Sequence, residues 1–317
     1  MKCCWSWELG QLENGSHKIL LKKIVNKDVI YQNISMKKFN SWKVGGNAEN
    51  YIEVSSEFRL QEVLEQKKIK LPITVIGLGS NVLIRDGGLK GTVINLSRGM
   101  KDIKNDENTI YAECGVSCSS LARYAAKNKK KSCAFLAGIP GSIGGALAMN
   151  AGCYGNETWD FVHKVKTINF SGNIAIKSKD DFEISYRNVK NLKNDIFIGA
   201  WFNFPDLCEQ DESEITRINI LLKRRRETQP LNWPTAGSTF KNPDNSFAAK
   251  LIQDAGLKGF TIGGARFSDK HANFIENMGN ASADDIEQLI YLAQKKIREL
   301  NDIDLQIEVK IIGDKSE

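Results

Sequence analysis

The chain has 317 residues, 41% of them hydrophobic and 26% charged, with a net charge of +6 at pH 7. This length allows two or three domains with their own cores, and the composition is that of a globular protein, which excludes disordered and fibrous classes. No apolar run is as long as a membrane span, and Glu8, Glu13 and His17 interrupt the region where a secretory signal would be apolar, so we expect a cytoplasmic protein without a membrane partner.

Cysteine and histidine spacing gives no metal or disulfide pattern. The seven cysteines form no CxxC pair, and the three histidines lie far apart. We therefore expect no metal and reduced thiols packed as small hydrophobic groups, with a redox or nucleophilic cysteine as the alternative.

Two basic runs, at 127–131 and 223–226, stand out in the charge pattern. The first is predicted to be the solvated end of a helix. Because no aromatic residues interleave a wide basic surface, we expect no nucleic-acid partner. The modest positive charge suits anionic small molecules such as nucleotides and phosphosugars.

In chain order, residues 1–35 are predicted to be a lead-in with helical character near "LKKIV". Glycine turns and short apolar runs then dominate residues 36–210. We expect helices at "EFRLQEVLEQKKI" and "CSSLARYAAKNK", and strands at "NYIEV", "ITVIGLG", "TVINL", "TIYAECG", "VHKVKTINF" and "IFIGAWFNF".

The polar, acidic segment at 206–215 marks a boundary, and residues 211–317 are predicted to form a separate α+β domain. We expect a helix through Arg226, a second helix at "FAAKLIQDAG" and a final strand at "LQIEVKIIG". A long helix should begin after Ser282, where Asp285 is placed for a capping box. Its predicted core stripe is Ile286, Leu289, Ile290, Ala293, Ile297 and Leu300.

The first glycine cluster, "VIGLGSNVLIRDGG", is not a Rossmann fingerprint, because Val82 replaces the third glycine and another strand follows. Gly77 and Gly79 allow close approach of an oxyanion to the backbone, and Ser80 and Asn81 add side-chain donors. A phosphate-binding loop and a simple turn are equally compatible with this segment.

The second cluster, "GIPGSIGGALAMNAGCYGN", has six glycines in its first eighteen residues. Ser142 is predicted to cap a short helix whose first turn carries Gly144 and Gly145, with exposed amides that bind a pyrophosphate. A tight packing corner without ligand is the alternative. Two glycine clusters in one domain indicate a single dinucleotide with two contact regions.

Eight motifs occur along the chain in this order: "SWKVGG", "GLGSNVLIRDGG", "GIPGSIGGALAMNAGCYG", "SYRN", "QPLNWPTAGSTFKNP", "AGLKG", "GGARFSDKHANFI" and "IEVKIIG". In order and spacing, this set resembles the motifs of the UDP-N-acetylenolpyruvoylglucosamine reductase family. The resemblance covers about residues 36–313 and is closest to the family's shorter-loop subgroup. One departure is Val189, where the family has serine or threonine.

The resemblance implies an α+β fold: a two-lobed FAD-binding domain of the vanillyl-alcohol-oxidase type over 36–210, with the lobes divided near 97, and a substrate domain over 211–317. It implies non-covalent FAD, NADPH as co-substrate, and reduction of the enolpyruvyl ether of a UDP-sugar to UDP-N-acetylmuramate for cell-wall synthesis. We expect a monomer. The alternatives are a sugar or alcohol oxidase of the same fold and a non-catalytic nucleotide-binding module.

The implied reaction needs a clamp for a carboxylate that gains charge and a proton donor for the adjacent carbon. Arg187 is the expected clamp, because a guanidinium matches a carboxylate with two parallel bonds. Ser238 is the expected proton donor. Glu308 is the third expected catalytic residue, with a perturbed pKa. Without the resemblance, these residues fit equally a surface arginine, a turn serine and a solvent-facing glutamate.

The remaining site residues fall into two sets. The positions expected to bind FAD are Gly45, Gly77, Gly79, Ser80, Asn81, Gly138, Gly141, Ser142, Gly144, Gly145, Asn150 and Gly152. Those expected to contact substrate are Arg226, Lys241 and Asn242. His271 is expected to be a structural, hydrogen-bonded histidine, and Cys153 is the cysteine to examine for a covalent flavin link.

Overall fold

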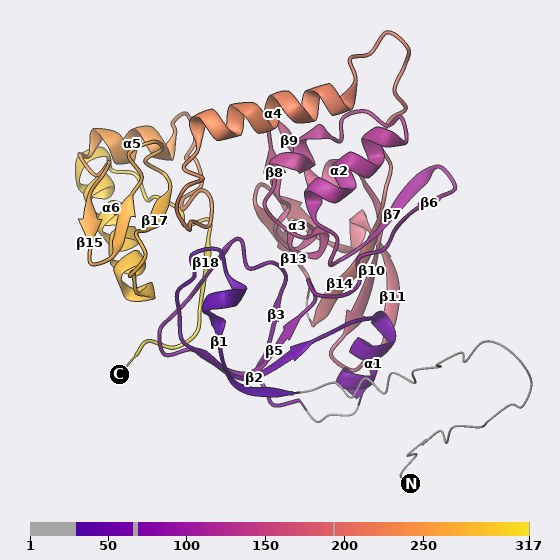
Figure 1. The fold of residues 1–317 in the computed structure, drawn as a ribbon, viewed down its shortest axis with the longest axis horizontal. Helices are drawn as coiled ribbons and strands as arrows, with labels where there is room; N and C mark the ends of the chain where they lie inside the picture. Colours follow the sequence, from indigo (N-terminus) through magenta and orange to yellow (C-terminus); the bar gives the residue numbers. More distant parts are fainter. Residues whose placement is uncertain (1–29, 66–68, 193, 317) are drawn as a thin grey trace, which may run out of the picture.

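The computed structural model describes residues 30–65, 69–192 and 194–316 and divides into two sheet-based lobes and a C-terminal domain (Figure 1). The helical character predicted near "LKKIV" lies outside the described residues. No helix within the described ranges is both long and apolar enough to cross a bilayer.

The first lobe is built on a four-stranded sheet in which β2, β5 and β3 run parallel and β1 is an antiparallel edge. Its elements are β1 (Tyr31–Ser35), β2 (Asn47–Glu53), α1 (Glu57–Glu65), β3 (Ile73–Ile76) and β5 (Leu89–Asn95). β1 belongs to the stretch predicted as a lead-in, so the end of that stretch forms part of the lobe. Leu60 and Leu64 of α1 are buried in a core shared with the second lobe.

The second lobe is an antiparallel sheet in the order β11-β10-β14-β7-β6. Its strands are β6 (Ile103–Asp106), β7 (Thr109–Glu113), β10 (Val162–Asn169), β11 (Ile174–Ser178) and β14 (Asp195–Phe202). The helices α2 (Cys118–Lys127) and α3 (Ile143–Met149) pack against it, with the hairpins β8–β9 (Gly152–Cys153, Asn156–Glu157) and β12–β13 (Glu183–Ser185, Asn188–Lys190). The predicted strands and helices of both lobes are therefore present.

The C-terminal domain contains α5 (Ala248–Asp254), the sheet β15–β16–β17 (Thr261–Ile262, Ala265–Phe267, Ile275–Asn277) and α6 (Ala283–Asn301). The predicted capping box is confirmed, since Ser282 Oγ accepts from Asp285 N at 3.0 Å and Asp285 Oδ2 accepts from Ser282 N at 2.9 Å. The predicted stripe is buried except for Leu300, which is 65% exposed because the last turn of α6 extends beyond the core.

The final strand does not stay in its own domain. β18 (Lys310–Ile312) pairs in parallel with β4 (Val82–Ile84) of the first lobe. Trp42, Val44 and Leu83 of that lobe belong to the same hydrophobic core as α5 and α6. The first lobe and the C-terminal domain are therefore joined by a continuous core, although the chain enters the domain from the second lobe.

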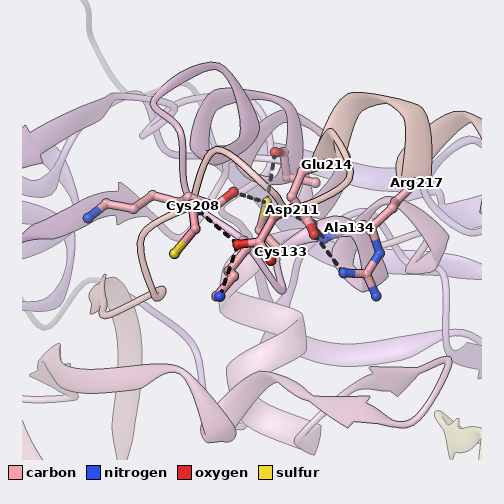
Figure 2. A network of polar contacts seen from close by, with 9 residues as sticks. Cys133, Ala134, Cys208, Asp211, Glu214 and Arg217 are labelled. Atoms are coloured by element: carbon pink, nitrogen blue, oxygen red, sulfur yellow. Dashed lines mark hydrogen bonds and ion pairs between the residues drawn. The ribbon is translucent and has the colours of Figure 1, made fainter.

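That entry is made by α4 (Glu214–Thr228), which spans from α2 to α5 along one side of the molecule (Figure 1). Its first residue is anchored in the second lobe (Figure 2): the Glu214 carboxylate is buried and accepts from Ala134 N at 2.9 Å and from Arg217 Nη1 at 3.0 Å. Cys133 Sγ lies 3.6 Å from the same carboxylate. The helix is thus fixed where it leaves the lobe.

The basic run at 127–131 differs from the expected solvated helix end. Lys130 pairs with Asp206 at 2.6 Å and Lys131 with Asp211 at 3.0 Å. The reason is a backbone contact, in which Lys131 N donates to Pro205 O at 2.8 Å and aligns the run with the acidic segment. Asp211 also accepts from Cys208 N at 2.8 Å, so the acidic segment is held against the residues that follow α2 (Figure 2).

Cysteine placement follows the prediction in the lobes. Cys114, Cys118 and Cys133 are buried free thiols, as predicted, while Cys153 is half-buried and Cys208 is exposed. Burial raises the pKa of Cys118 to about 12 and that of Cys133 to about 12, so these thiols stay protonated and behave as apolar groups.

A buried ion pair ties the first lobe to α6. Arg85 Nη2 and Nε donate to Glu287 at 2.8 and 2.9 Å, and Tyr291 Oη donates to the same carboxylate at 2.8 Å. The Glu287 side chain is 2% exposed and that of Arg85 28%. Asp86, next in the chain, accepts from Ala283 N and Asp284 N at the start of α6. These contacts fix the orientation of α6 on the lobe.

Replacing Arg85 by methionine is expected to lower the free energy of unfolding by about 3 kcal/mol at pH 7, because the buried Glu287 carboxylate loses both hydrogen bonds from the guanidinium. Arg85 holds the pKa of Glu287 below its usual 4.5, so this stabilisation is present above pH 4.5 and is lost as the pH falls through the lowered folded-state pKa. Urea denaturation at neutral and acidic pH measures both effects.

The matched control is Arg298→Met, which breaks an exposed pair with Asp304 and should cost less than about 1 kcal/mol. Equal losses in the two variants, or a loss from Arg85→Met that does not shrink below pH 4.5, would contradict the assignment of Glu287 as a buried, paired carboxylate.

Candidate active site

Arg187 and Glu308, 121 positions apart in the sequence, meet where the second lobe faces the last segment of the chain. Arg187 Nε lies 3.3 Å from Glu308 Oε1, and the side chains are 19% and 9% exposed. Nε is buried and makes no hydrogen bond within the described part of the chain. The pair therefore has an ionic contact but leaves donor capacity on the guanidinium.

Ser238 directly precedes Thr239, the residue that contacts the segment carrying Glu308. Glu308 N donates to Thr239 O at 2.8 Å, and an antiparallel bridge joins Phe240 to Ile307. Ser238 is half-buried and follows Gly237, whose φ is +81°. A Cβ added at Gly237 would have no neighbouring group within 4 Å. The three residues predicted to act together are thus brought to one region, with an open side at Gly237.

The Arg187 backbone is in an unusual conformation. Ser185 pairs with Asn188, so Tyr186 and Arg187 form the two-residue turn of the β12–β13 hairpin, and Arg187 has φ +53°. An L-residue with a branched or long side chain adopts this left-handed region at a cost of about 1–2 kcal/mol, and glycine or asparagine is the usual occupant. Glycine would be less strained than arginine at this position, so the backbone conformation makes Arg187 a candidate for a functional role.

Burial raises the pKa of Glu308, while the positive charges of Arg187 and Lys241 act in the opposite direction. This agrees with the expected perturbed glutamate. Glu308 is not the solvent-facing glutamate that the residue alone would also allow, because Glu308 and its neighbour Val309 are both buried. Regular pairing with β4 begins only at Lys310, and residue 308 lies in the irregular stretch before it.

The two glycine clusters face each other across the lobes. A methyl group at Gly77 would collide with Ser142 Oγ, and one at Gly141 would lie 3.5 Å from Ser80 Oγ. Between them opens a cleft of about 240 Å³. Glycine at position 77 therefore lets the lobes approach this closely without displacing the Ser142 hydroxyl.

This cleft is lined by glycines of the expected cofactor set and by apolar side chains. Its lining combines predicted positions with apolar side chains from both lobes: Ile73, Val75, Gly77, Leu96, Ser142, Gly144, Gly145, Ala148, Phe170, Leu192, Ile196 and Phe197. Sequence reasoning missed the apolar members, because an isolated valine or phenylalanine in a strand pattern looks like any core residue. The side chains of Val75 and Ala148 are exposed here, as a ligand-facing surface requires.

The expected pyrophosphate site at the start of α3 is partly corrected. Ile143 N donates to Val116 O at 2.8 Å and Gly144 N to Cys114 O at 2.9 Å, so these two amides are already used within the protein. Ser142 is the N-cap residue, but its side chain makes no capping hydrogen bond. The reason is that the segment before α3 packs beside residues 114–117, which supply the carbonyl acceptors.

Two asparagines expected at the cofactor also bind protein groups. Asn81 Nδ2 donates to Glu308 O at 3.2 Å, which ties the first glycine loop to the segment that carries Glu308. Asn150 is 1% exposed and donates to Glu157 Oε2 at 2.6 Å and to Ser185 O at 3.2 Å. Their contacts with FAD stay predictions.

Four other expected cofactor glycines have packing reasons of their own. A Cβ at Gly138 would meet Cys153 and Tyr154, and one at Gly152 would meet Asn156 O at 2.8 Å. Gly45 has φ +101° and lies against β4, and Gly79 has φ +67° and lies against residues 39–40. A Cβ at any of the four would therefore collide with a neighbouring group, which is backbone at Gly45, Gly79 and Gly152 and side chains at Gly138.

The three residues expected to contact substrate lie in different surroundings. Lys241 is close enough to Glu308 for its charge to oppose the rise of the carboxyl pKa. Asn242 Oδ1 accepts from Ala248 N at 3.1 Å, at the start of α5. Arg226 is exposed near the end of α4, where its carbonyl accepts from Lys270 Nζ at 2.5 Å.

Sequence reasoning passed over Arg225, which is half-buried and whose charge, with that of Arg187, acts on Cys153. Burial raises the pKa of the Cys153 thiol despite these two arginines. His271 differs from the expected hydrogen-bonded residue: its Nδ1 is buried with no partner in the described part of the chain, because the ring packs edge-on against Phe274 at 4.8 Å.

Comparisons with known proteins match both halves of this arrangement. The family model "FAD binding domain" matches residues 48–176, and the model for the C-terminal domain of UDP-N-acetylenolpyruvoylglucosamine reductase matches residues 229–312. The enzyme of that name from Coxiella burnetii (strain CbuG_Q212) is 44% identical, with 87% of this chain and 93% of the relative covered. That from Legionella pneumophila (strain Paris) is 45% identical, with 89% and 93% covered.

A solved structure shows the same architecture. The crystal structure of UDP-N-acetylenolpyruvylglucosamine reductase from Thermus caldophilus superposes with a TM-score of 0.77 at 26% identity, with 90% of this chain and 100% of that chain covered. Together with the FAD-domain match, this confirms the predicted α+β fold, with a two-lobed FAD-binding domain joined to a separate C-terminal domain.

Proposed function

The chain belongs to the UDP-N-acetylenolpyruvoylglucosamine reductase family, a family of FAD-containing oxidoreductases, and we propose that Arg187, Ser238 and Glu308 carry its reaction. The proposed reaction reduces the enolpyruvyl ether of UDP-N-acetylglucosamine to UDP-N-acetylmuramate, with NADPH as co-substrate. The observation that supports it best is the convergence of the Arg187–Glu308 pair, at 3.3 Å, with the segment that carries Ser238.

FAD, bound in the cleft between the lobes, would supply the hydride that adds to the terminal carbon of the enolpyruvyl group. The substrate carboxylate then gains negative charge, and the guanidinium of Arg187 binds it with hydrogen bonds that strengthen as that charge develops. The Arg187 side chain is 19% exposed, so part of the guanidinium is open to a ligand while Nε faces Glu308.

Ser238 is proposed to give a proton to the carbon adjacent to the carboxylate. A serine hydroxyl is a weak acid, so it can do this only against a strongly basic carbanion-like centre that lies within hydrogen-bond reach. Gly237 leaves space beside Ser238 for the substrate. The product keeps the negative carboxylate, and the serine regains its proton from solvent.

Glu308 is proposed to orient Arg187 and, in its protonated form, to donate to the substrate carboxylate. Burial favours the protonated form, since it raises the pKa of this carboxyl, and an acceptor-only carboxylate next to the substrate carboxylate would be repulsive. Lys241, Asn242 and Arg226 are proposed to contact the sugar and diphosphate. We further propose that the protein works as a cytoplasmic monomer.

A flavin absorbance experiment tests this function. Purified protein is expected to be yellow, to bleach with NADPH under anaerobic conditions, and to regain its colour on addition of UDP-N-acetylglucosamine enolpyruvate but not of UDP-N-acetylglucosamine. Recovery of colour with air at the rate seen with the enolpyruvyl sugar would instead support an oxidase of the same fold. A colourless protein that still binds nucleotide would support a binding module.

A further inference from the structure

The helix α3 ends at Asn150, a polar residue that is buried from solvent. Asn150 is 1% exposed and has φ +46°, the left-handed conformation that asparagine tolerates better than most residues. A polar amide is retained in such a place only when its hydrogen-bonding groups have partners.

Those partners lie in two different segments. Asn150 Nδ2 donates to Ser185 O at 3.2 Å and to Glu157 Oε2 at 2.6 Å. Its Oδ1 accepts from Trp159 N at 3.2 Å. The amide is therefore fully oriented, with its donor nitrogen toward the β12–β13 hairpin.

The contact at Ser185 lies at the base of the turn that carries Arg187. Ser185 is the last residue of β12 and pairs with Asn188, so the two residues between them depend on this pair for their geometry. The hairpin has only three residues in each strand, and a two-stranded hairpin of this size is marginally stable without outside contacts. Arg187 is moreover held at φ +53°, a conformation that the surroundings must enforce.

We propose that Asn150 is a positioning residue that holds the Tyr186–Arg187 turn, and with it the guanidinium clamp, in register with Glu308. This inference rests on the proposed role of Arg187. The same short helix contributes Gly144 and Gly145 to the cleft between the lobes, so α3 fixes the distance from that cleft to the clamp. A neutral amide suits this place because aspartate would set an acceptor against both Ser185 O and Glu157.

The test compares Asn150→Gly with Asn191→Gly. Both remove an asparagine side chain at a positive φ, which glycine adopts freely, so the backbone of each is preserved. Asn191 Nδ2 binds Glu183 Oε1 at 3.0 Å at the open end of the same hairpin, away from the turn. Any general loosening of the hairpin should therefore appear in both variants.

Hydrogen–deuterium exchange in the absence of substrate is the first measurement. Asn150→Gly should speed exchange in residues 183–190 at least several-fold, with little change in 238–242, whereas Asn191→Gly should leave the turn protected. The second measurement is rapid mixing. Reoxidation of the NADPH-reduced enzyme by the enolpyruvyl sugar should slow about 10- to 100-fold in Asn150→Gly, as expected for a misplaced clamp, with the NADPH step within twofold of wild type.

Asn150→Asp gives a second route if the glycine variant loses FAD or folds poorly. A carboxylate there cannot donate, but a protonated carboxyl can, so its reoxidation rate should recover toward wild type as the pH is lowered. The inference is overturned if hydrogen exchange in residues 183–190 is unchanged in Asn150→Gly. It is also overturned if reoxidation slows equally in Asn191→Gly, or if the NADPH step of Asn150→Gly slows as much as its reoxidation. If the wild-type enzyme is not reoxidised by the enolpyruvyl sugar, the proposed function fails, while the exchange comparison still decides whether Asn150 holds the turn.

Discussion

Replacing Ser238 by alanine is expected to slow reoxidation of the reduced enzyme by the enolpyruvyl sugar by about 10³-fold, the usual scale for loss of a positioned general acid. The reduction of FAD by NADPH should keep its wild-type rate, because Ser238 has no part in that step. Stopped-flow absorbance of the two half-reactions, measured separately, distinguishes these effects. A serine that only shapes the turn after Gly237 would give a small change in both.

The matched control for Ser238→Ala is the neighbouring Thr239→Val. Thr239 is fully buried, and its Oγ1 has no hydrogen-bond partner in the described part of the chain. Valine has nearly the same shape, so both half-reactions should be unchanged, and stability should stay the same or rise by about 1 kcal/mol as an unsatisfied hydroxyl is removed. If Thr239→Val slows reoxidation as much as Ser238→Ala, the effect belongs to the packing of this segment, and the proton-donor role is wrong.

Replacing Arg187 by glycine is expected to slow the same half-reaction by about 10²- to 10³-fold, since the developing carboxylate charge loses its clamp. Arg187→Ala should be equally inactive. The two variants should differ in stability: both lose the contact with Glu308, but only glycine accepts φ +53° without strain. The glycine variant should therefore be more stable than the alanine variant by about 1 kcal/mol, measured by urea denaturation.

This comparison separates the fold from the chemistry at one position. An arginine kept for stability would make both variants unstable and leave the rate per folded molecule close to wild type. If the alanine variant is as stable as the glycine variant, the turn is relaxed in solution, and the conformational argument for a functional arginine is lost.

The local structure was largely predictable from the sequence. The capping box at Ser282 and Asp285 and the 3.6-residue stripe of α6 follow from short-range spacing, and both are present. The strands around Ile94, Ile168 and Ile198 follow from apolar runs between glycine-rich turns in the same way. Such patterns are informative because a helix or strand buries residues at a fixed period, whatever it packs against.

The sequence also pointed to Arg187, Ser238 and Glu308, but only through the set of motifs that resembles a family. Taken singly, each looked like an ordinary surface or turn residue. Nothing local distinguishes a glutamate that is 9% exposed beside an arginine from one that faces solvent, because burial at residue 308 comes from distant segments.

What the sequence by itself determined about this protein is the set of elements, the glycine positions that allow close backbone approach, and the chemistry that the candidate residues could carry. Only the tertiary structure decided that β18 pairs with β4, that the amides of Ile143 and Gly144 are already used, and that Asn150 faces the Arg187 turn. The physical reason is that these contacts join segments tens to hundreds of residues apart. Their partners are selected by the packing of whole lobes, and no periodic pattern along the chain records that packing.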